Sequence, residues 1–183
     1  MVPAMSEIPT LETERLILRG WRADDLDWYA PFLGDAHSTR YIGGPVPRGE
    51  AWLRMAAQAG HWPLRGYGRF VLEDRTTKSV VGYCGPSYPV GFPEPEIGWG
   101  LLPAARGKGY ATEAAQRTLQ YVFGPLGWST AVSMIGPENT ASIRVAERLG
   151  ARLDGTTEFK GATYGLYRHP VPSRSTLNRG TAP

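Results

Sequence analysis

The hydrophobic pattern of the chain changes its period at a glycine-rich stretch, residues 103–116, which reads PAARGKGYATEAAQ. Before it, IGWGLL (97–102) is a short apolar run that predicts a strand. After it, apolar residues recur at helical spacing: Ala111, Ala114, Ala115, Leu119 and Val122. A strand that passes through glycines into a helix leaves the first N–H groups of that helix without partners, and the helix dipole favours an anion there. The stretch is therefore a candidate anion site.

Two common phosphate motifs do not fit this stretch. A Walker A loop needs glycine at 102 and serine or threonine at 109, where the chain has Leu102 and Gly109. A dinucleotide fingerprint that starts at Gly107 needs glycine or alanine at 112, where the chain has Thr112. Both classes of nucleotide site are excluded.

What remains is the pattern Arg106-x-x-Gly109-x-Ala111 between a strand and a helix. Gly107 and Gly109 allow backbone turns that other residues avoid, and a pyrophosphate can approach a backbone that carries no side chains. Arg106 and Lys108 add positive charge at the rim. The alternative is an ordinary glycine-rich turn with solvated charges, and the stretch taken alone is compatible with both.

The rest of the chain mixes predicted strands and helices in the order of a single αβ domain. We expect strands over 12–21, 97–102 and 129–136, a hairpin over 68–85, and two short strands within 156–169. We expect helices from near residues 24–25, over 50–60 with Gly60 as C-cap, over 111–123, and over 139–150. Asn139 is the predicted N-cap of the last helix, and Ala141, Val145 and Leu149 its inner stripe. Residues 42–49 and 86–96 are predicted loops, and the polar tail 170–183 is predicted to be disordered.

Length and composition limit the classes of protein further. The 183 residues suffice for one domain with a substantial core. No run approaches about 18 apolar residues, so no membrane span is predicted, and the first residues lack the pattern of a secretory signal. Cys84 is the only cysteine, so no internal disulfide can form and a cytoplasmic location is expected. It lies in the apolar run VVGYCG without an adjacent histidine or lysine, which favours a buried structural thiol over a nucleophile.

The charge balance argues against nucleic acid as a partner. The formal net charge is +3, but two of the twenty basic residues, Arg174 and Arg179, lie in the tail. Residues 1–169 therefore carry 18 basic and 17 acidic groups, which leaves no electrostatic footprint for DNA or RNA. The three histidines show no metal-ligand spacing, so no metal is expected; they are His37, His61 and His169.

The glycine-rich pattern resembles motif A of the GNAT acetyltransferases, Gln/Arg-x-x-Gly-x-Gly/Ala. LETERLILRGW, EIGWGLLPAARGKGYATEA and NTASIRVAERLGA follow in the right order and look like the RimJ/RimL-type branch, covering roughly residues 11–168. The resemblance implies an α+β GNAT fold: a mostly antiparallel mixed sheet of about six or seven strands, splayed at its centre and flanked by about four helices. The implied acetyltransferase domain spans 11–169, after an N-terminal segment 1–10.

The resemblance also implies acetyl-CoA as co-substrate, with its pyrophosphate on the glycine-rich loop and its pantetheine arm in the gap between the 97–102 and 129–136 strands. Asn139 resembles the family's asparagine that contacts the cofactor, although a plain N-cap is equally compatible. The implied cofactor residues are Trp99, Leu101, Leu102, Arg106, Gly107, Lys108, Gly109, Tyr110, Ala111, Thr112, Asn139 and Ser142.

Direct acyl transfer needs a neutral amine and a stabilised oxyanion. An α-amine with a pKa of about 8 costs about 1.4 kcal/mol to deprotonate at pH 7, against about 4.6 for a lysine. A carboxylate acting through water therefore suffices. Glu96 matches a glutamate common in the branch and is the preferred catalytic base, ahead of Glu94 and Glu158. Its alternative role is a structural tie to backbone or arginine.

Many GNAT enzymes carry a tyrosine seven residues after the asparagine to protonate the departing thiolate, whereas this chain has Ala146. A thiol with a pKa of about 8.5 leaves as thiolate at pH 7 at a cost near 2 kcal/mol, so that acid is helpful rather than required. Ser142 matches a serine of the RimJ/RimL branch and is the second catalytic candidate, as a hydrogen-bond donor to the sulfur. Its alternative role is to cap the helix backbone.

The resemblance implies direct transfer of an acetyl group from acetyl-CoA to a primary amine in a ternary complex. The acceptor is either a protein N-terminus or a small-molecule amine. A non-catalytic acyl-CoA-binding module is the alternative, and both a monomer and a homodimer are compatible with the family. Two or three aromatic residues of the N-terminal half are expected to line the acceptor site, from Trp21, Trp28, Trp52, Trp62, Tyr41 and Tyr67.

Overall fold

The strand predicted over 12–21 is divided in two. The protein is described here by a computed structural model that covers residues 7–172. In it, β1 (Leu11–Glu12) and β2 (Leu16–Arg19) pair antiparallel, with Leu11 opposite Leu18. The Thr13 side chain accepts the Leu16 N–H at 2.9 Å, and the Leu16 carbonyl accepts the Thr13 N–H at 2.9 Å. These local hydrogen bonds reverse the chain, so the prediction of one continuous strand is wrong.

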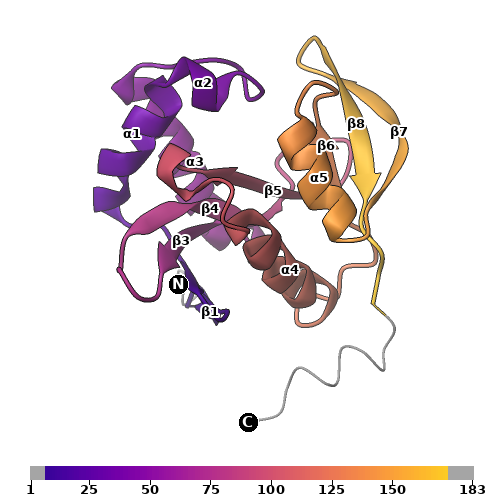
Figure 1. The fold of residues 1–183 in the computed structure, drawn as a ribbon, viewed down its shortest axis with the longest axis horizontal. Helices are drawn as coiled ribbons and strands as arrows, with labels where there is room; N and C mark the ends of the chain where they lie inside the picture. The colour runs from indigo at the N-terminus through magenta and orange to yellow at the C-terminus, as the bar shows by residue number, and fades with distance from the viewer. Residues whose placement is uncertain (1–6, 173–183) are drawn as a thin grey trace.

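The strands of the described chain form one eight-stranded sheet in the order β1-β2-β3-β4-β5-β6-β8-β7 (Figure 1). The remaining strands are β3 (Phe70–Asp74), β4 (Val80–Ser87), β5 (Glu96–Leu101), β6 (Val132–Ile135), β7 (Arg152–Phe159) and β8 (Ala162–Arg168). Every neighbouring pair is antiparallel except β5–β6. The hairpin over 68–85 and the mixed, mostly antiparallel sheet are confirmed. The sheet has one strand more than the upper expected number of seven, because the strand predicted over 12–21 is divided into β1 and β2.

The sheet splits at its centre, as expected. The parallel strands β5 and β6 are in register at one pair, Glu96 with Val132, next to the Val132 N–H that donates to the Pro95 carbonyl at 3.0 Å. One residue further, the Ile97 carbonyl accepts a side-chain hydrogen bond, from the Ser133 hydroxyl at 2.7 Å. Beyond that point the ladder ends and the two strands separate.

The helices are α1 (Leu26–Gly34), α2 (Ala36–Thr39), α3 (Arg48–Arg65), α4 (Tyr110–Phe123) and α5 (Thr140–Arg148), with short 3₁₀ turns η1 (Ala23–Asp25) and η2 (Pro103–Ala105). The prediction that Gly60 ends the third helix is wrong. The helix continues until Gly66, whose φ of +76° and N–H bond to the Trp62 carbonyl make it the C-cap. The Trp62 ring packs edge-on against the Phe70 ring, with 4.9 Å between the ring centroids. This tertiary contact stabilises the part of the helix beyond Gly60.

Asn139 caps α5 as predicted, because its Oδ1 accepts the Ser142 N–H at 3.2 Å. The predicted inner stripe of this helix is confirmed at Leu149, which packs against the main core cluster, but is wrong at Ala141 and Val145. Ala141 is exposed and Val145 is half-buried, whereas Ala146 is fully buried, in a small cluster with Ile135. The apolar stripe at 141 and 145 therefore faces something other than the protein core.

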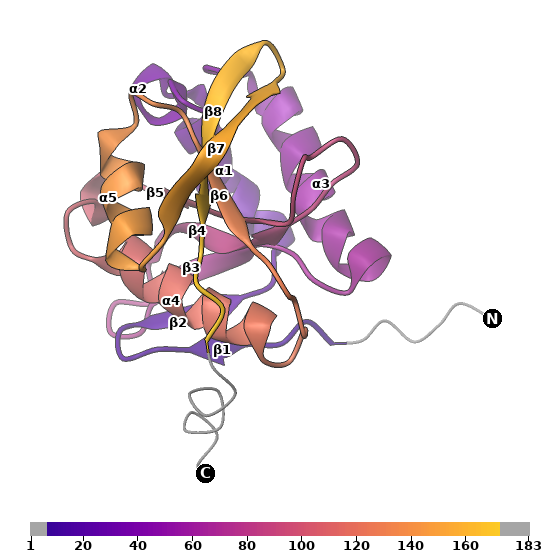
Figure 2. The same ribbon diagram turned by 90° about the vertical axis from the view of Figure 1, so that its right-hand side faces the viewer.

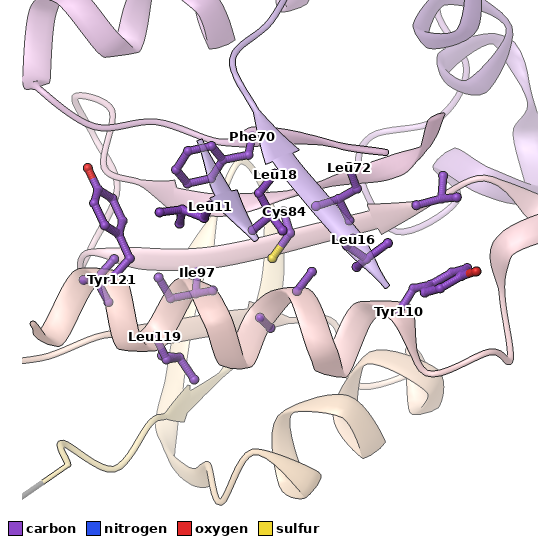
Figure 3. Close-up of a cluster of buried hydrophobic side chains, with 14 of the residues drawn as sticks. Leu11, Leu16, Leu18, Phe70, Leu72, Cys84, Ile97, Tyr110, Leu119 and Tyr121 are labelled. Carbon is purple, nitrogen blue, oxygen red and sulfur yellow. The ribbon is translucent and has the colours of Figure 1, made fainter. Parts of the chain in front are cut away.

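Two hydrophobic clusters cover opposite faces of the sheet. One lies between the strands and α4, where Leu16, Phe70 and Leu72 face α4 residues such as Tyr121 (Figure 3). The other lies against α1 and α3, around Tyr83 of β4. Successive residues of a strand point to opposite faces, so Cys84 belongs to the first cluster. Its thiol is buried 3.6 Å from the Thr118 hydroxyl, and burial raises its pKa to about 12. Cys84 is the inert structural thiol that was predicted.

The C-terminal strands close one side of the molecule. Strands β6, β7 and β8 lie together with α5, opposite α1–α3 across the split in the sheet (Figures 1 and 2). Within residues 7–172, no helix has both the length and the apolar character of a membrane span. The predicted disorder of the tail concerns residues that, from 173 onward, lie outside the described part of the chain.

Candidate functional site

A cavity of about 450 Å³ occupies the split in the sheet. Its walls come from the α1–α2 region, from β5, from the loop between β5 and α4, and from α5. It brings together residues far apart in the sequence, from Phe32 to Arg148. The expected cofactor residues that line it are Trp99, Leu101, Arg106, Gly107, Gly109, Ala111, Thr112, Asn139 and Ser142.

Three expected cofactor residues do not line this cavity. Leu102 packs against the cluster under α1 and α3, and its N–H donates to the Val81 carbonyl at 2.9 Å. The Lys108 side chain is exposed at the rim. Tyr110, the first residue of α4, points into the core, and its hydroxyl donates to Asp74 at 2.6 Å. From this stretch, Gly107, Gly109, Ala111 and Thr112 border the cavity instead.

The loop between β5 and α4 presents a run of free N–H groups. Gly107 and Gly109 have φ of +75° and +85°, and Gly109 is the N-cap of α4 without a side-chain cap. Within the described chain, the N–H groups of residues 107–112 donate to neither a backbone nor a side-chain acceptor, whereas Glu113 N–H already bonds to the Gly109 carbonyl. The helix dipole adds to their positive potential. This is the geometry of a phosphate site at a helix N-terminus.

The β1–β2 turn holds this loop from its outer side. Arg15 donates through Nη1 to the Lys108 carbonyl at 2.9 Å and through Nε to Glu113 at 2.7 Å. Glu113 also accepts the Thr13 hydroxyl at 2.6 Å and the Arg15 N–H at 2.9 Å. The loop and the first turn of α4 are therefore fixed before any ligand binds.

The cavity is strongly cationic. Its lining contains Arg40, Arg106, Arg144 and Arg148, and no aspartate or glutamate. Arg106 is held by its own contacts, since Nε donates to the Leu101 carbonyl at 3.2 Å and Nη2 to the Ser38 hydroxyl at 2.7 Å. Several like charges without counter-ions favour a ligand that carries more than one negative charge.

The exposed stripe of α5 belongs to this cavity. Ala141, Arg144, Val145 and Arg148 all line it, and their spacing of i, i+3, i+4 and i+7 places them on one face of the helix. Sequence reasoning missed both arginines, although this spacing in NTASIRVAER was visible. The face is half apolar and half cationic, so it suits a ligand with both an apolar arm and phosphate groups.

The edge of β5 adds backbone groups to the same cavity. Ile97 pairs with Pro86, which has no N–H, so the polar groups of Ile97 point away from β4 and toward β6. Alternation along the strand gives Trp99 and Leu101 the same orientation. Because β6 has separated there, the backbone groups of Trp99 and the Leu101 N–H face the cavity, where an extended amide-containing chain can pair with them. The Leu101 carbonyl already accepts Arg106 Nε.

A second, smaller cavity of about 90 Å³ adjoins the first. Six residues line both cavities and mark their junction: Tyr41, Ile42, Tyr83, Trp99, Asn139 and Ser142. The smaller cavity also contains Glu96, which is 7% exposed. The two candidate catalytic residues, Glu96 and Ser142, thus lie in its lining, whereas Glu94 is bound to Arg168 at 2.8 Å and Glu158 bonds to Thr163 on β8, outside both cavities.

Glu96 is paired with a residue that sequence reasoning missed. Arg69 donates through Nη2 to Glu96 Oε2 at 2.8 Å and lies over the ring of Tyr83. Burial raises the pKa of Glu96, and the Arg69 charge opposes that rise. The sequence signal was the alternating glycines of IGWGLL. A Cβ at Gly98 would lie 2.6 Å from Arg69 Nη2, and one at Gly100 2.6 Å from Tyr83 Cε1, so both glycines leave room for these side chains.

Of the six aromatic residues considered for an acceptor site, Tyr41 alone lines the cavities. Its hydroxyl donates to the Glu138 carbonyl at 2.9 Å and so bridges the split between the α2 side and the α5 side. Trp21 and Trp28 stack on each other at 5.6 Å, while Tyr67 packs on Trp128. Within residues 7–172, no group of His, Cys, Asp and Glu side chains is arranged to hold a metal ion.

The fold and the site together define a protein with a split sheet, a cationic cavity in the split and a buried carboxylate beside it. Residues 15–152 match the family described as Acetyltransferase (GNAT) domain. The chain is 31% identical over 149 residues to an uncharacterized N-acetyltransferase, p20, of Bacillus licheniformis, covering 80% of this chain and 84% of that one.

Solved structures agree with this match. An acetyltransferase from Agrobacterium tumefaciens superposes with a TM-score of 0.83 at 32% identity, covering 90% of this chain and 96% of the other. A spermidine N-acetyltransferase from Vibrio cholerae, solved with CoA and spermine, shares the fold. It superposes with a TM-score of 0.68 at 20% identity, covering 85% of this chain and 94% of the other. The chain belongs to the GNAT acetyltransferase family and is an acyltransferase.

Proposed function

We propose that the protein binds acetyl-CoA in the larger cavity and transfers the acetyl group directly to a primary amine that enters the smaller one. The observation that carries the proposal is the junction of the two cavities. On one side lie free N–H groups and four arginines without a carboxylate, and on the other lies one buried carboxylate. Such a junction suits a ternary complex, in which both substrates are bound before reaction.

The chemistry of the larger cavity fits coenzyme A part by part. The N–H groups of residues 107–112 suit a pyrophosphate, and Arg144 and Arg148 suit further phosphate oxygens. The open backbone edge at Trp99 and Leu101 suits the amides of a pantetheine arm, which would lead toward the junction. Ala141 and Val145 supply apolar contact along the same path.

Glu96 is the proposed catalytic base. The amine nitrogen forms the new N–C bond to the thioester carbonyl, and its surplus proton passes to the Glu96 carboxylate directly or through one water. The C–S bond then breaks and the thiolate takes up a proton. Arg69 keeps Glu96 charged in its buried position, which is the form that accepts a proton.

Ser142 is the proposed donor to the departing sulfur. It lies at the junction and its N–H donates to Asn139 Oδ1, while its hydroxyl has no hydrogen-bond partner among residues 7–172. The position of the family tyrosine is Ala146, which is fully buried against Ile135 and therefore has no room for a larger side chain facing the sulfur. We further propose membership of the RimJ/RimL-type branch, with protein N-termini or small amines as acceptors.

The test is thiol release from acetyl-CoA by the purified protein against a panel of amines. The panel contains peptides with Ala, Ser and Met at the N-terminus, amino acids, polyamines and aminoglycosides. Release that one class stimulates well above hydrolysis, with acetylated product found by mass spectrometry, supports the proposal. Tight CoA binding without acetylation of any amine would instead favour the alternative, a non-catalytic acyl-CoA-binding module.

A further inference from the structure

The smaller cavity is narrow. Its volume of about 90 Å³ corresponds to about three water molecules. An amino nitrogen with two or three carbon atoms fills it, so the part of an acceptor that enters must be a slender stem. Anything larger has to remain outside, on the side of Tyr41 and Ile42.

The charges that an acceptor meets are unevenly distributed. Taken together, the linings of the two cavities contain one carboxylate, Glu96 of the smaller cavity. They contain five guanidinium groups, those of Arg40, Arg69, Arg106, Arg144 and Arg148. Glu96 is already paired with Arg69 at 2.8 Å. An acceptor with one ammonium group can use Glu96, but a second ammonium group on the same short stem finds no further carboxylate and is repelled by Arg69.

The Arg69 guanidinium is held in the position from which it repels a second ammonium group. Its guanidinium sits against the Cα of Gly98 and over the ring of Tyr83, with 5.6 Å from its Cζ to the ring centroid. Its carbonyl accepts the indole N–H of Trp21 at 2.9 Å. Its Nε is buried without a hydrogen-bond partner within residues 7–172, so Glu96 is the acceptor that holds the guanidinium. Nothing else in the lining neutralises its charge.

We propose that the smaller cavity takes a primary amine with a single positive charge on a short stem, and that Arg69 is the residue that excludes di- and polyamines. This inference rests on the proposed function. It names the acceptor class and a specificity-determining residue for the same site.

The experiment compares n-propylamine with 1,3-diaminopropane, which share a three-carbon stem and differ by the second amino group. The readout is the ratio of their kcat/KM values for thiol release, measured for the wild type, Arg69→Met, Arg69→Gln and Arg69→Lys. The solution pKa values of the amines cancel when this ratio is compared between variants. Arg48→Met is the control, because Arg48 pairs with Asp27 on the surface, carries the same charge and lines neither cavity.

We expect Arg69→Met and Arg69→Gln to shift the ratio toward the diamine at least about tenfold, because the guanidinium charge that repels the second ammonium group is then removed. Arg69→Lys and Arg48→Met are expected to keep the wild-type ratio. Arg69→Gln retains a hydrogen-bond donor for Glu96 and serves if Arg69→Met does not fold. An unchanged ratio in both neutral variants, or a wild type that prefers spermidine over monoamines, overturns the inference.

Calorimetric titration of the CoA-saturated protein with the same two amines separates this inference from the proposed function. It reports charge selection without turnover. If no amine is acetylated but the diamine binds more weakly than the monoamine in an Arg69-dependent way, the proposed function fails and the charge selection stands. If acetylation occurs without Arg69-dependent selection, the reverse holds.

Discussion

At the scale of single residues, two kinds of glycine shape the site. Gly107 and Gly109 hold positive φ angles that aim backbone N–H groups into the cavity. Gly98 and Gly100 lie in a strand, and their missing side chains give space to Arg69 and Tyr83. The first kind was recognisable from local chain rules, because turns at positive φ favour glycine. The second kind was visible as an alternation in IGWGLL, but the side chains for which it leaves room were not, because they depend on which residues the neighbouring strand places beside β5.

Gly109→Val is expected to weaken CoA binding at least about tenfold, because a branched side chain at the N-cap strains the loop and crowds the site of the pyrophosphate. Binding is measured by calorimetry. Gly91→Val is the matched control, since Gly91 has a φ of +90°, open surroundings and no place in either cavity. Equal CoA affinity in the two variants would count against a pyrophosphate at this loop.

Glu96→Gln is expected to lower kcat at least about tenfold while CoA affinity is retained, because an amide cannot accept the proton of the amine. Glu94→Gln, two residues away but bound to Arg168 outside the cavities, should keep wild-type turnover. Steady-state kinetics with the best amine of the panel measures both. Undiminished turnover in Glu96→Gln would mean that the carboxylate is structural.

At the scale of elements, the loop works because another element supports it. Thr13 and Arg15 of the β1–β2 turn donate hydrogen bonds to Glu113 near the start of α4. Glu113 lies about a hundred residues later in the sequence. The N-terminal strand was predicted as one piece, and its division produces this support. A turn set by local hydrogen bonds thus supports a distant glycine-rich loop.

Glu113→Ala is expected to lower the free energy of unfolding by about 1–2 kcal/mol, since three donors lose their acceptor at a partly buried position. CoA affinity should also fall severalfold, because Arg15 loses the carboxylate that holds it against the Lys108 carbonyl. Chemical denaturation and calorimetry measure the two effects. Glu147→Ala on the exposed side of α5 is the control. A stability loss with unaltered CoA binding would show that the turn supports the fold but not the site.

At the scale of the whole molecule, the two halves meet at the point where the sheet splits. Ser133 of β6 donates to the Ile97 carbonyl of β5 and lies 2.9 Å from Nε2 of His169, which is 2% exposed. Since the hydroxyl proton serves Ile97, Nε2 of His169 donates to Ser133. A neutral histidine thus braces the junction of the halves, and burial lowers its pKa to about 4.

This histidine makes stability depend on pH. Between the ordinary histidine pKa of about 6.5 and the lowered value of about 4, the unfolded chain binds a proton that the folded chain does not. The free energy of unfolding should therefore fall as pH decreases through this window, by up to about 3 kcal/mol from this group. Above pH 6.5 and below pH 4 the group contributes no further slope.

Urea denaturation at several pH values measures the effect. His169→Gln keeps a donor for Ser133 and is expected to flatten the slope between pH 6.5 and 4. His37→Gln, at an exposed position, should leave it unchanged. Parallel slopes for the His169→Gln variant and the wild type would show that other groups cause the acid sensitivity.

The sequence by itself determined the glycine turn before α4, the hairpin, the cap of α5 and the order of the elements, because each depends on residues close together in the chain. The tertiary structure decided the rest. Trp62 extends α3 by packing on Phe70, Ala141 and Val145 turn toward a cavity instead of the core, and Arg69 reaches Glu96 across 27 positions of sequence. Hydrogen bonds and φ preferences act over a few residues, whereas burial and ion pairing depend on which distant strands and helices the fold brings together.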